Sequence, residues 1–234
     1  SKAPRPSWRD RAFVVRTYDF GEADRVVVLL TKNHGLIRGV AKGVRKAKSR
    51  FGSRLQPFVE VDALIYPGKN LATIASADTV TYYGARIIDD FDRYAAACAV
   101  LETAEKLSYD EADPALFALV EGALENLQTD QHPTMVLDAF ILQATEHAGW
   151  GLSLFNCANC GAPGPHKAFN AAVGGAVCNN CRPPGSLDVE RETLHDMWLM
   201  QRGSPVSSQR AAQIHRATVA HLQFNLETGL KSLK

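Results

Sequence analysis

The chain contains two CxxC pairs, Cys157-Ala158-Asn159-Cys160 and Cys178-Asn179-Asn180-Cys181, which are separated by seventeen residues. This spacing is typical of a structural zinc site, in which each CxxC turn points two thiolates at one tetrahedral ion. Glycines and prolines are frequent in the intervening segment, so it can fold back and bring the second pair to the first. We predict one structural Zn²⁺ per chain, held by Cys157, Cys160, Cys178 and Cys181, with no coordination position left for catalysis.

Two disulfides or two redox-active dithiols are the alternatives for these cysteines. Disulfides need an oxidising compartment, and we see no apolar signal segment at the start of this sequence. A thioredoxin-like motif needs a βαβ context, whereas both pairs lie among turn residues. His166 lies between the pairs, but four thiolates at this spacing make it redundant as a ligand. The fifth cysteine, Cys98, falls on an apolar helical stripe, and we expect it to be a small buried core residue.

The composition is that of an ordinary globular protein, because 46% of the 234 residues are hydrophobic and 22% are charged. This length is long for one domain and sufficient for two. No apolar run approaches the roughly 18 residues of a membrane span. We therefore expect a cytoplasmic protein with no membrane partner.

The net charge of +1 conceals a segregation of charge along the chain. Residues 25–59 contain nine basic residues and no acidic one, whereas residues 89–130 contain eleven acidic residues against Arg93 and Lys106. Nine unrelieved positive charges repel one another without a counter-anion, which favours an anionic ligand over a merely solvated face. The predicted DNA-binding residues are Lys32, Arg38, Lys42, Arg45, Lys46, Lys48, Arg50 and Arg54. The candidates for a second DNA face are Arg182, Arg191, Arg202, Arg210 and Arg216.

Five short strands are predicted in the first third of the chain, at residues 11–17, 26–30, 36–40, 58–66 and 71–76. Five strands in about seventy residues favour a small closed barrel of the OB-fold type, with an SH3-like barrel as the alternative. The basic segment 42–54 has little periodicity and two glycines, so we expect a mobile loop between the third and fourth strands. Phe51 in this loop is the aromatic residue best placed for stacking on a base, since barrel packing is the simpler role for the others.

After Gly84 the apolar period becomes helical, beginning with a stripe through Phe91, Tyr94, Cys98, Leu101 and Ala104. Further helices are expected to begin at the capping positions Asp113-Pro114, His132-Pro133, Ser186, and Ser207 or Ser208, the last helix carrying Ile214, Leu222, Leu226 and Leu230. The predicted fold class is α+β. It consists of an OB-fold DNA-binding domain at residues 1–83 and an α-helical domain at residues 84–234. The helical domain contains the inserted four-cysteine zinc knuckle at about residues 154–184.

This arrangement resembles the RecO family of bacterial recombination mediators over almost the whole length of the chain. The cysteine block with its glycine pair is the specific part of the likeness, and the barrel motifs alone are weaker. The motifs that carry the resemblance are Gly21-x-x-Asp24-Arg25, the stretch Leu29–Gly35, the Lys/Arg-rich loop, Gly149-Trp150, Leu154-x-x-Cys157-x-x-Cys160-Gly161, and Phe169 followed by Gly174-Gly175-x-x-Cys178-x-x-Cys181.

The resemblance implies a DNA-repair and recombination protein that is not an enzyme. Such proteins bind single- and double-stranded DNA and anneal complementary strands. With RecR, and in some bacteria RecF, they help RecA to load on DNA covered by single-strand binding protein. They also bind the acidic C-terminal tail of that protein, usually through the helical domain. Other RecO-like proteins keep the fold without all four cysteines, which implies a structural metal.

The residues themselves offer no catalytic constellation. The sequence contains no phosphate-binding Gly-x4-Gly-Lys-Ser/Thr, no HExxH and no Gly-x-Ser-x-Gly, and its histidines are scattered. We therefore expect no bound nucleotide and no ATP requirement. Two other functions remain open from the residues alone. One is an RNA-binding module built from the barrel and the knuckle, and the other is a scaffold whose basic loop meets an acidic protein.

Overall fold

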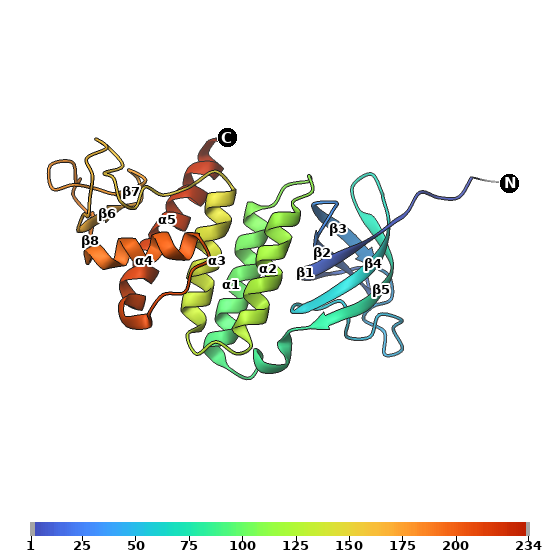
Figure 1. Ribbon diagram of the computed structural model, residues 1–234. Coiled ribbons are helices and arrows are strands. Elements are labelled where there is room, and N and C mark those ends of the chain that lie inside the picture. Colours follow the sequence, from blue (N-terminus) through green and yellow to red (C-terminus); the bar gives the residue numbers. More distant parts are fainter. Residues whose placement is uncertain (1–2, 233–234) are drawn as a thin grey trace. The chain divides into compact units, whose positions relative to one another are not determined.

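The computed structural model describes residues 3–232, with side chains up to residue 227 in the last helix. Leu230, expected on the apolar face of that helix, lies outside the described side chains. The chain forms two compact units, Ser1–Thr129 and Asp130–Lys234. The first contains the barrel and two helices, and the second contains three helices and the four cysteines (Figure 1). None of the described helices is long and apolar enough to cross a membrane.

The first unit is built on a closed five-stranded barrel, as the sequence predicted. The strands follow the order β1-β2-β3-β5-β4, and β4 pairs back with β1. All neighbouring pairs are antiparallel except β3 and β5, which are parallel. The barrel strands are β1 (Trp8–Phe20), β2 (Asp24–Thr31), β3 (Leu36–Ala41), β4 (Val59–Tyr66) and β5 (Ala72–Tyr82).

The barrel core follows the alternation of the strands and contains one unexpected residue. Val59, Val61 and Ile65 of β4 point inward and are buried. Phe51, which the sequence suggested for base stacking, is only 1% exposed and packs into the same core. The stacking assignment for Phe51 is therefore wrong, because its aromatic surface is more stably placed among barrel side chains than in water.

The acidic segment belongs to the same compact unit as the barrel. It includes a short 3-10 helix, η1 (Gly84–Arg86), then α1 (Phe91–Leu107) and α2 (Pro114–Leu127). The Asp113 side chain accepts a hydrogen bond from Leu116 N at 3.0 Å, which confirms the predicted start of α2. Phe117 of α2 packs on Phe13 of β1 with 5.1 Å between ring centroids. Glu105 accepts a 2.8 Å hydrogen bond from Arg16.

The buried face of α1 differs from the predicted stripe. Phe91 is 83% exposed and Cys98 is also exposed, so the expectation of a buried core cysteine is wrong. Leu101 and Ala104 of the predicted stripe are buried as expected, and the rest of the buried face is made by Ala96, Ala97, Val100 and Leu107. Small alanine side chains allow close packing of helices, and this gain outweighs the burial of one large ring at the end of the helix.

The second unit packs three helices against a small three-stranded sheet. The helices are α3 (Pro133–His147), α4 (Arg191–Gln201) and α5 (Ala211–Ser232), preceded by the short 3-10 helix η2 (Ser208–Arg210). The sheet has the order β7-β6-β8, formed by β7 (Gly175–Ala176), β6 (Ala168–Asn170) and β8 (Leu187–Asp188). Phe169 of β6 is fully buried with Leu194 and Ile214 from α4 and α5. The sheet is therefore part of the core of the helical unit.

The helix starts of this unit were predicted with partial success. Pro133 begins α3, and Ser207 Oγ accepts a 3.0 Å hydrogen bond from Gln209 N before the last helix, both as expected. Ser186 does not cap α4, since its hydroxyl donates to Pro183 O and the N-cap position belongs to Glu190. The rigid Pro183-Pro184-Gly185 turn holds Ser186 before β8 instead.

A buried carboxyl lies between the barrel and α2 within the first unit. The side chain of Glu60 on β4 is 1% exposed, and its Oε2 is 3.7 Å from Arg11 Nη1. Burial, together with a hydrogen bond to the Glu121 side chain, raises the pKa of Glu60 from 4.5 to about 7. The folded chain therefore keeps this proton at pH values where the unfolded chain has lost it. This contribution to stability is complete below about pH 4.5 and is lost as the pH rises through 7.

Replacing Glu60 by Gln should remove this pH dependence. We expect Glu60→Gln and wild type to have similar melting temperatures at pH 5. At pH 8.5 the variant should be several degrees more stable, because it has no buried carboxylate to ionise. Thermal melting from pH 4.5 to 8.5 measures the difference. Glu102→Gln, at an exposed carboxylate on α1, is the matched control and should follow wild type throughout. A constant difference between Glu60→Gln and wild type across this range would contradict the prediction.

Candidate metal centre and nucleic-acid-binding surface

Two tight turns present the cysteine side chains. In the first, Gly161 N donates to Cys157 O at 2.9 Å, and Cys157 N donates to Ala162 O at 2.8 Å. In the second, Cys181 N and Arg182 N both donate to Cys178 O, at 3.2 and 3.0 Å. Gly161 adopts φ = 76°, a left-handed conformation that glycine reaches without steric cost. Each CxxC segment is thus a turn that directs two sulfurs to the same side.

The four sulfurs converge on one point. The ligand atoms of Cys157, Cys160, Cys178 and Cys181 all lie within 4.8 Å of one another, and Cys160 Sγ is 3.9 Å from Cys178 Sγ. A tetrahedral ion with metal–sulfur distances of about 2.3 Å requires sulfur–sulfur distances of about 3.8 Å. A disulfide would bring two sulfurs to about 2.05 Å, and all four cysteines are free thiols here. The cluster therefore has the geometry to hold one metal ion.

Hydrogen bonds make one of these thiols markedly acidic. The backbone N–H groups of Cys160 and Cys178 lower the pKa of Cys157 to about 6, and Cys178 N lies 3.4 Å from Cys157 Sγ. For Cys181, the Asn159 side chain lowers the pKa, but contacts with the sulfurs of Cys178, Cys160 and Cys157 together raise it to about 11. The pKa values of Cys157 and Cys181 are thus moved in opposite directions within one group of closely spaced sulfurs. A metal ion binds by displacing the thiol protons, so metal and protons compete for the cluster.

The Gly174-Gly175 pair fixes the knuckle to the rest of the second unit. Ser153 N donates to Gly174 O at 3.0 Å, and Ala176 N donates to Ser153 O at 2.7 Å. A Cβ atom at Gly175 would lie 2.0 Å from Ser153 O, and this residue also has φ = 141°. Only glycine permits this close approach of two backbone segments. The glycine pair thereby aligns β7, which leads directly to Cys178.

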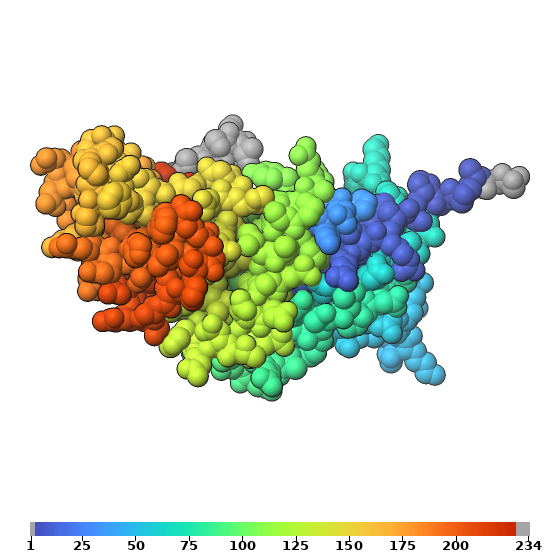
Figure 2. Space-filling model, in the orientation of Figure 1, coloured from blue at the N-terminus to red at the C-terminus, as the bar shows by residue number. Residues whose placement is uncertain are grey.

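The basic segment 42–54 has no helix or strand, as predicted, but it is tied down at several points. Gly43 N donates to Asp24 Oδ1 at 2.7 Å, and Arg45 N donates to Ala23 O at 3.0 Å. The buried side chains of Phe51 and Leu55 anchor its second half in the barrel core. The segment protrudes from the surface of the barrel in light blue in Figure 2. We refer to residues 42–54 as the basic loop.

The eight predicted DNA-binding residues are all exposed, but they do not form a single cluster. Six of them lie on the basic loop: Lys42, Arg45, Lys46, Lys48, Arg50 and Arg54. Arg38 lies within β3, and Lys32 follows β2 at the hairpin turn, at the other end of β3 from the loop. Six strand residues correspond to about 20 Å, so Lys32 is separated from the loop by roughly that length.

Two loop arginines are partly committed to protein contacts. Arg45 Nη1 lies 3.7 Å from Asp19 Oδ2, and Arg54 Nη1 donates to Ala77 O at 3.3 Å. Among the described residues, no ion pair involves Lys42, Lys46, Lys48 or Arg50. The four exposed cations without an acidic partner are therefore the part of the loop best able to bind phosphate.

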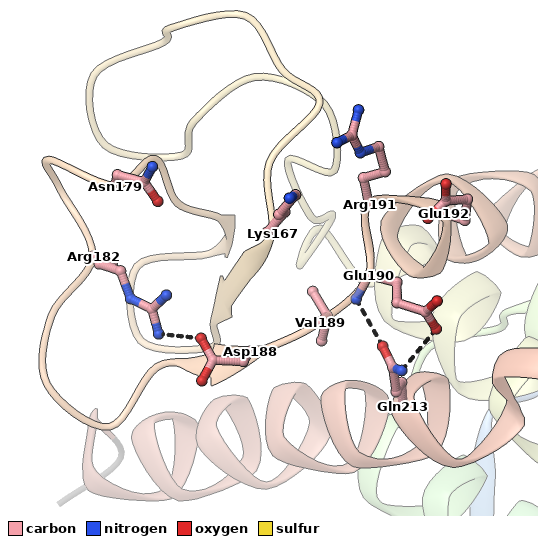
Figure 3. A pocket seen from close by; sticks show the side chains of 9 residues that line it. All are labelled: Lys167, Asn179, Arg182, Asp188, Val189, Glu190, Arg191, Glu192 and Gln213. Carbon is pink, nitrogen blue, oxygen red and sulfur yellow. Dashed lines mark hydrogen bonds and ion pairs between the residues drawn. The ribbon is translucent and has the colours of Figure 1, made fainter.

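The five candidates for a second face fall into two groups. Arg182 pairs with Asp188 at 2.7 Å, and Arg210 pairs with Asp196 at 3.4 Å while being only 18% exposed (Figure 3 shows the first pair). Arg191, Arg202 and Arg216 are exposed. The sequence did not distinguish the two groups, because the carboxylates that neutralise Arg182 and Arg210 come from other segments of the fold.

The sequence analysis missed the aromatic residues beside these arginines. Phe155 is 55% exposed and Trp198 is 38% exposed in the second unit. Trp198 shares its helix with Leu194 and Met197, which are buried. The signal that was available is the spacing of Arg191, His195, Trp198 and Arg202, which places them on one face of α4.

The closed barrel and the cysteine cluster define a class of protein in which a small OB-type barrel precedes a helical region that carries a four-cysteine knuckle. Two family models match the chain: Recombination protein O N terminal over residues 6–83 and Recombination protein O C terminal over residues 88–234. The chain therefore belongs to the RecO family, whose members are mediators of recombinational DNA repair. The boundary between the two family models lies between residues 83 and 88, whereas the boundary between the two compact units lies after Thr129. The two boundaries differ because α1 and α2 pack on the barrel.

Removal of one exposed ligand should reveal whether a metal ion stabilises the knuckle. Cys160 is exposed, so Cys160→Ser changes little packing and reports mainly on the metal. Loss of a structural metal ligand is expected to cost about 3 kcal/mol, which lowers the melting temperature by roughly 6–12 °C for a chain of this length. Metal analysis by mass spectrometry and thermal melting provide the two readouts.

Cys98→Ser is the matched control, because Cys98 is also exposed and lies outside the cluster. It should leave metal content and melting temperature unchanged. Purified wild type with reduced thiols and far less than one metal ion per chain would contradict the prediction. Equal melting temperatures for Cys160→Ser and Cys98→Ser would also contradict the prediction.

Proposed function

We propose that this protein binds single- and double-stranded DNA without reading sequence and anneals complementary strands without a nucleotide. The observation that carries the proposal is the basic loop, whose Lys42, Lys46, Lys48 and Arg50 are exposed and have no acidic partner among the described residues. Membership of the RecO family supports DNA as the polyanion. Lys32, Arg38, Arg45 and Arg54 are proposed to extend the phosphate contacts.

Annealing in this proposal requires no catalytic residue. Two DNA strands repel each other through their phosphates, and a basic surface that binds both releases condensed counterions and lowers this barrier. Base pairing then supplies the favourable free energy. The protein is accordingly proposed not to be an enzyme and to need no ATP. A chain that bridges two strands needs two basic surfaces. The basic loop is one, and the second compact unit supplies the other.

We propose that the metal ion is zinc and that its role is structural. Four thiolates in a tetrahedral arrangement are the preferred donor set of a closed zinc site, and they leave no position for water or substrate. Cys157, Cys160, Cys178 and Cys181 would hold the ion. The ion would cross-link the two CxxC turns of the knuckle. Phe169 packs the knuckle on the helices of the second unit.

We propose that the protein acts with RecR to help RecA load on DNA covered by single-strand binding protein. The family supports partners of this kind. The tail of single-strand binding protein is acidic, so it should be repelled by the acidic α1 and α2 of the first unit. The second unit, with exposed Arg191, Arg202 and Arg216, is the more favourable place for it.

The basic loop should bind DNA through phosphate alone. With about five phosphates neutralised, the slope of log affinity against log salt should be about −4 for duplex DNA and shallower for single strands. Lys46→Glu/Lys48→Glu should weaken binding equally on all sequences and reduce the steepness of this slope by about 2. Fluorescence anisotropy between 50 and 300 mM NaCl measures both quantities. Arg86→Glu/Lys106→Glu makes the same change in net charge outside the loop and should retain the wild-type slope. If both double variants behave alike, the loop is not the phosphate site.

Annealing should be accelerated at fixed salt in the absence of ATP. Complementary fluorescently labelled oligonucleotides should pair faster with wild type than spontaneously, because the protein lowers the repulsion between backbones. Lys46→Glu/Lys48→Glu should lose this acceleration while retaining weak DNA binding through the second unit. No acceleration by the wild-type protein would exclude the proposed mechanism. Preferential binding of RNA over DNA of matched length would then favour an RNA-binding module, and absence of nucleic-acid binding at low salt would favour a scaffold.

A further inference from the structure

A regular stripe of cationic and aromatic side chains runs along α4. Arg191, His195, Trp198 and Arg202 follow one another at intervals of four, three and four residues, and all four are exposed. These intervals place the side chains on one face of a helix. With a rise of 1.5 Å per residue, the stripe is about 16 Å long. The far side of the same helix buries Met197 and Met200 in the core, so the stripe has a rigid support.

The ring of Trp198 is held by its neighbours on this stripe. The Arg202 guanidinium carbon lies 4.1 Å from the centroid of the Trp198 ring, a cation–π contact. The His195 ring is stacked with the Trp198 ring, with 5.8 Å between centroids and 18° between planes. An exposed indole whose plane is fixed in this way is pre-organised to stack on another flat ring.

The knuckle faces this stripe across a largely apolar hollow of about 560 Å³. Leu154, Phe155 and Pro165 line it from the knuckle, and His195 and Trp198 line it from α4. Phe155 is 55% exposed, which is unusual for a phenylalanine. His166 also lines the hollow and is held by a 2.9 Å hydrogen bond from its ring to Ala162 O. The hollow therefore offers aromatic faces on both walls.

A second hollow, of about 610 Å³, adjoins the first because the two share Arg191 and Glu192 (Figure 3). Its lining is polar and includes Lys167, Asn179 and Arg182. Asp188 is paired with Arg182 at 2.7 Å, and Glu190 accepts a 2.9 Å hydrogen bond from Gln213 Nε2. Three cations and three carboxylates line this hollow in all. Glu190 also lies 3.9 Å from Arg210, outside the lining, whereas Lys167 and Arg191 are exposed cations with no ion pair among the described residues.

We propose that the two hollows form a binding site for single-stranded DNA. A base stacks between Phe155 and Trp198, and the adjacent phosphates lie against Lys167 and Arg191. An aromatic hollow beside two cations that have no ion pair among the described residues, Lys167 and Arg191, matches the alternation of base and phosphate along an unpaired strand. A duplex does not fit in this way, because its bases are already stacked inside the helix. The inference rests on the proposed DNA-binding function and assigns the second surface to unpaired strands.

The test compares oligonucleotides with and without bases. Full-length wild type should bind a fifteen-nucleotide oligothymidylate more tightly than an abasic oligonucleotide of equal length, since stacking favours each bound base. Phe155→Ala/Trp198→Ala should weaken oligothymidylate binding by about 5-fold or more and leave abasic binding unchanged. Phe91→Ala is the matched control, because it removes an 83% exposed aromatic ring from α1 in the other unit. It should leave both affinities unchanged.

A conservative variant separates stacking from a change in fold. Trp198→Phe should keep most of the affinity, and it should reduce the quenching of intrinsic fluorescence by oligothymidylate, because Trp198 is one of only three tryptophans. Wild type that binds oligothymidylate no differently from the alanine double variant would overturn this inference while leaving the proposed function intact. Wild type that binds neither oligonucleotide would overturn the proposed function as well. If an acidic peptide containing one phenylalanine binds this site and oligothymidylate does not, the site serves a protein and the inference is wrong.

Discussion

The convergence of four sulfurs on one point is the constraint on which the second unit depends. The strands β6, β7 and β8 contain only two or three residues each, and so short a sheet has little stability of its own. Cys178, two residues after β7, donates a 3.4 Å backbone hydrogen bond to the sulfur of Cys157, which lies in the segment before the sheet. One metal ion would replace the many contacts that so small a sheet cannot make. The cluster therefore fixes the position of Phe169 in the core and the position of Phe155 on the surface.

In the first unit some acidic residues are used within the fold, whereas Lys42, Lys46, Lys48 and Arg50 of the basic loop have no acidic partner among the described residues. Glu105 pairs with Arg16, and Glu60 shares a proton with Glu121 beneath α2. The basic loop is held against its own repulsion by the burial of Phe51, which contributes about 1.5–3 kcal/mol. A loop held by apolar anchors can keep its cations free for a ligand. This explains why an aromatic residue within a basic segment points inward.

The sequence predicted the parts of the structure that follow from local spacing. The two CxxC pairs indicated the sulfur cluster, the alternation in β4 indicated a barrel, and Asp113 indicated the start of α2. It failed where packing between distant segments decides the outcome. Cys98 and Phe91 are exposed because the alanine face of α1 packs more closely than the predicted stripe. Arg182 and Arg210 are not freely available cations, because Asp188 and Asp196 pair with them. The residues immediately before and after each arginine do not indicate these pairs.

The two proposed DNA surfaces differ in what they would recognise, and this difference would allow the paired product to leave one of them. In this proposal the basic loop binds phosphate, so it would hold single strands and duplex alike. The hollow between Phe155 and Trp198 holds only an unpaired base, because stacking on the protein competes with stacking inside the duplex. When complementary strands pair, the hollow must release its base, and the free energy of base pairing provides for this release. In this proposal the hollow between Phe155 and Trp198 binds the unpaired strand more strongly than the duplex. The duplex can therefore leave this surface without nucleotide hydrolysis.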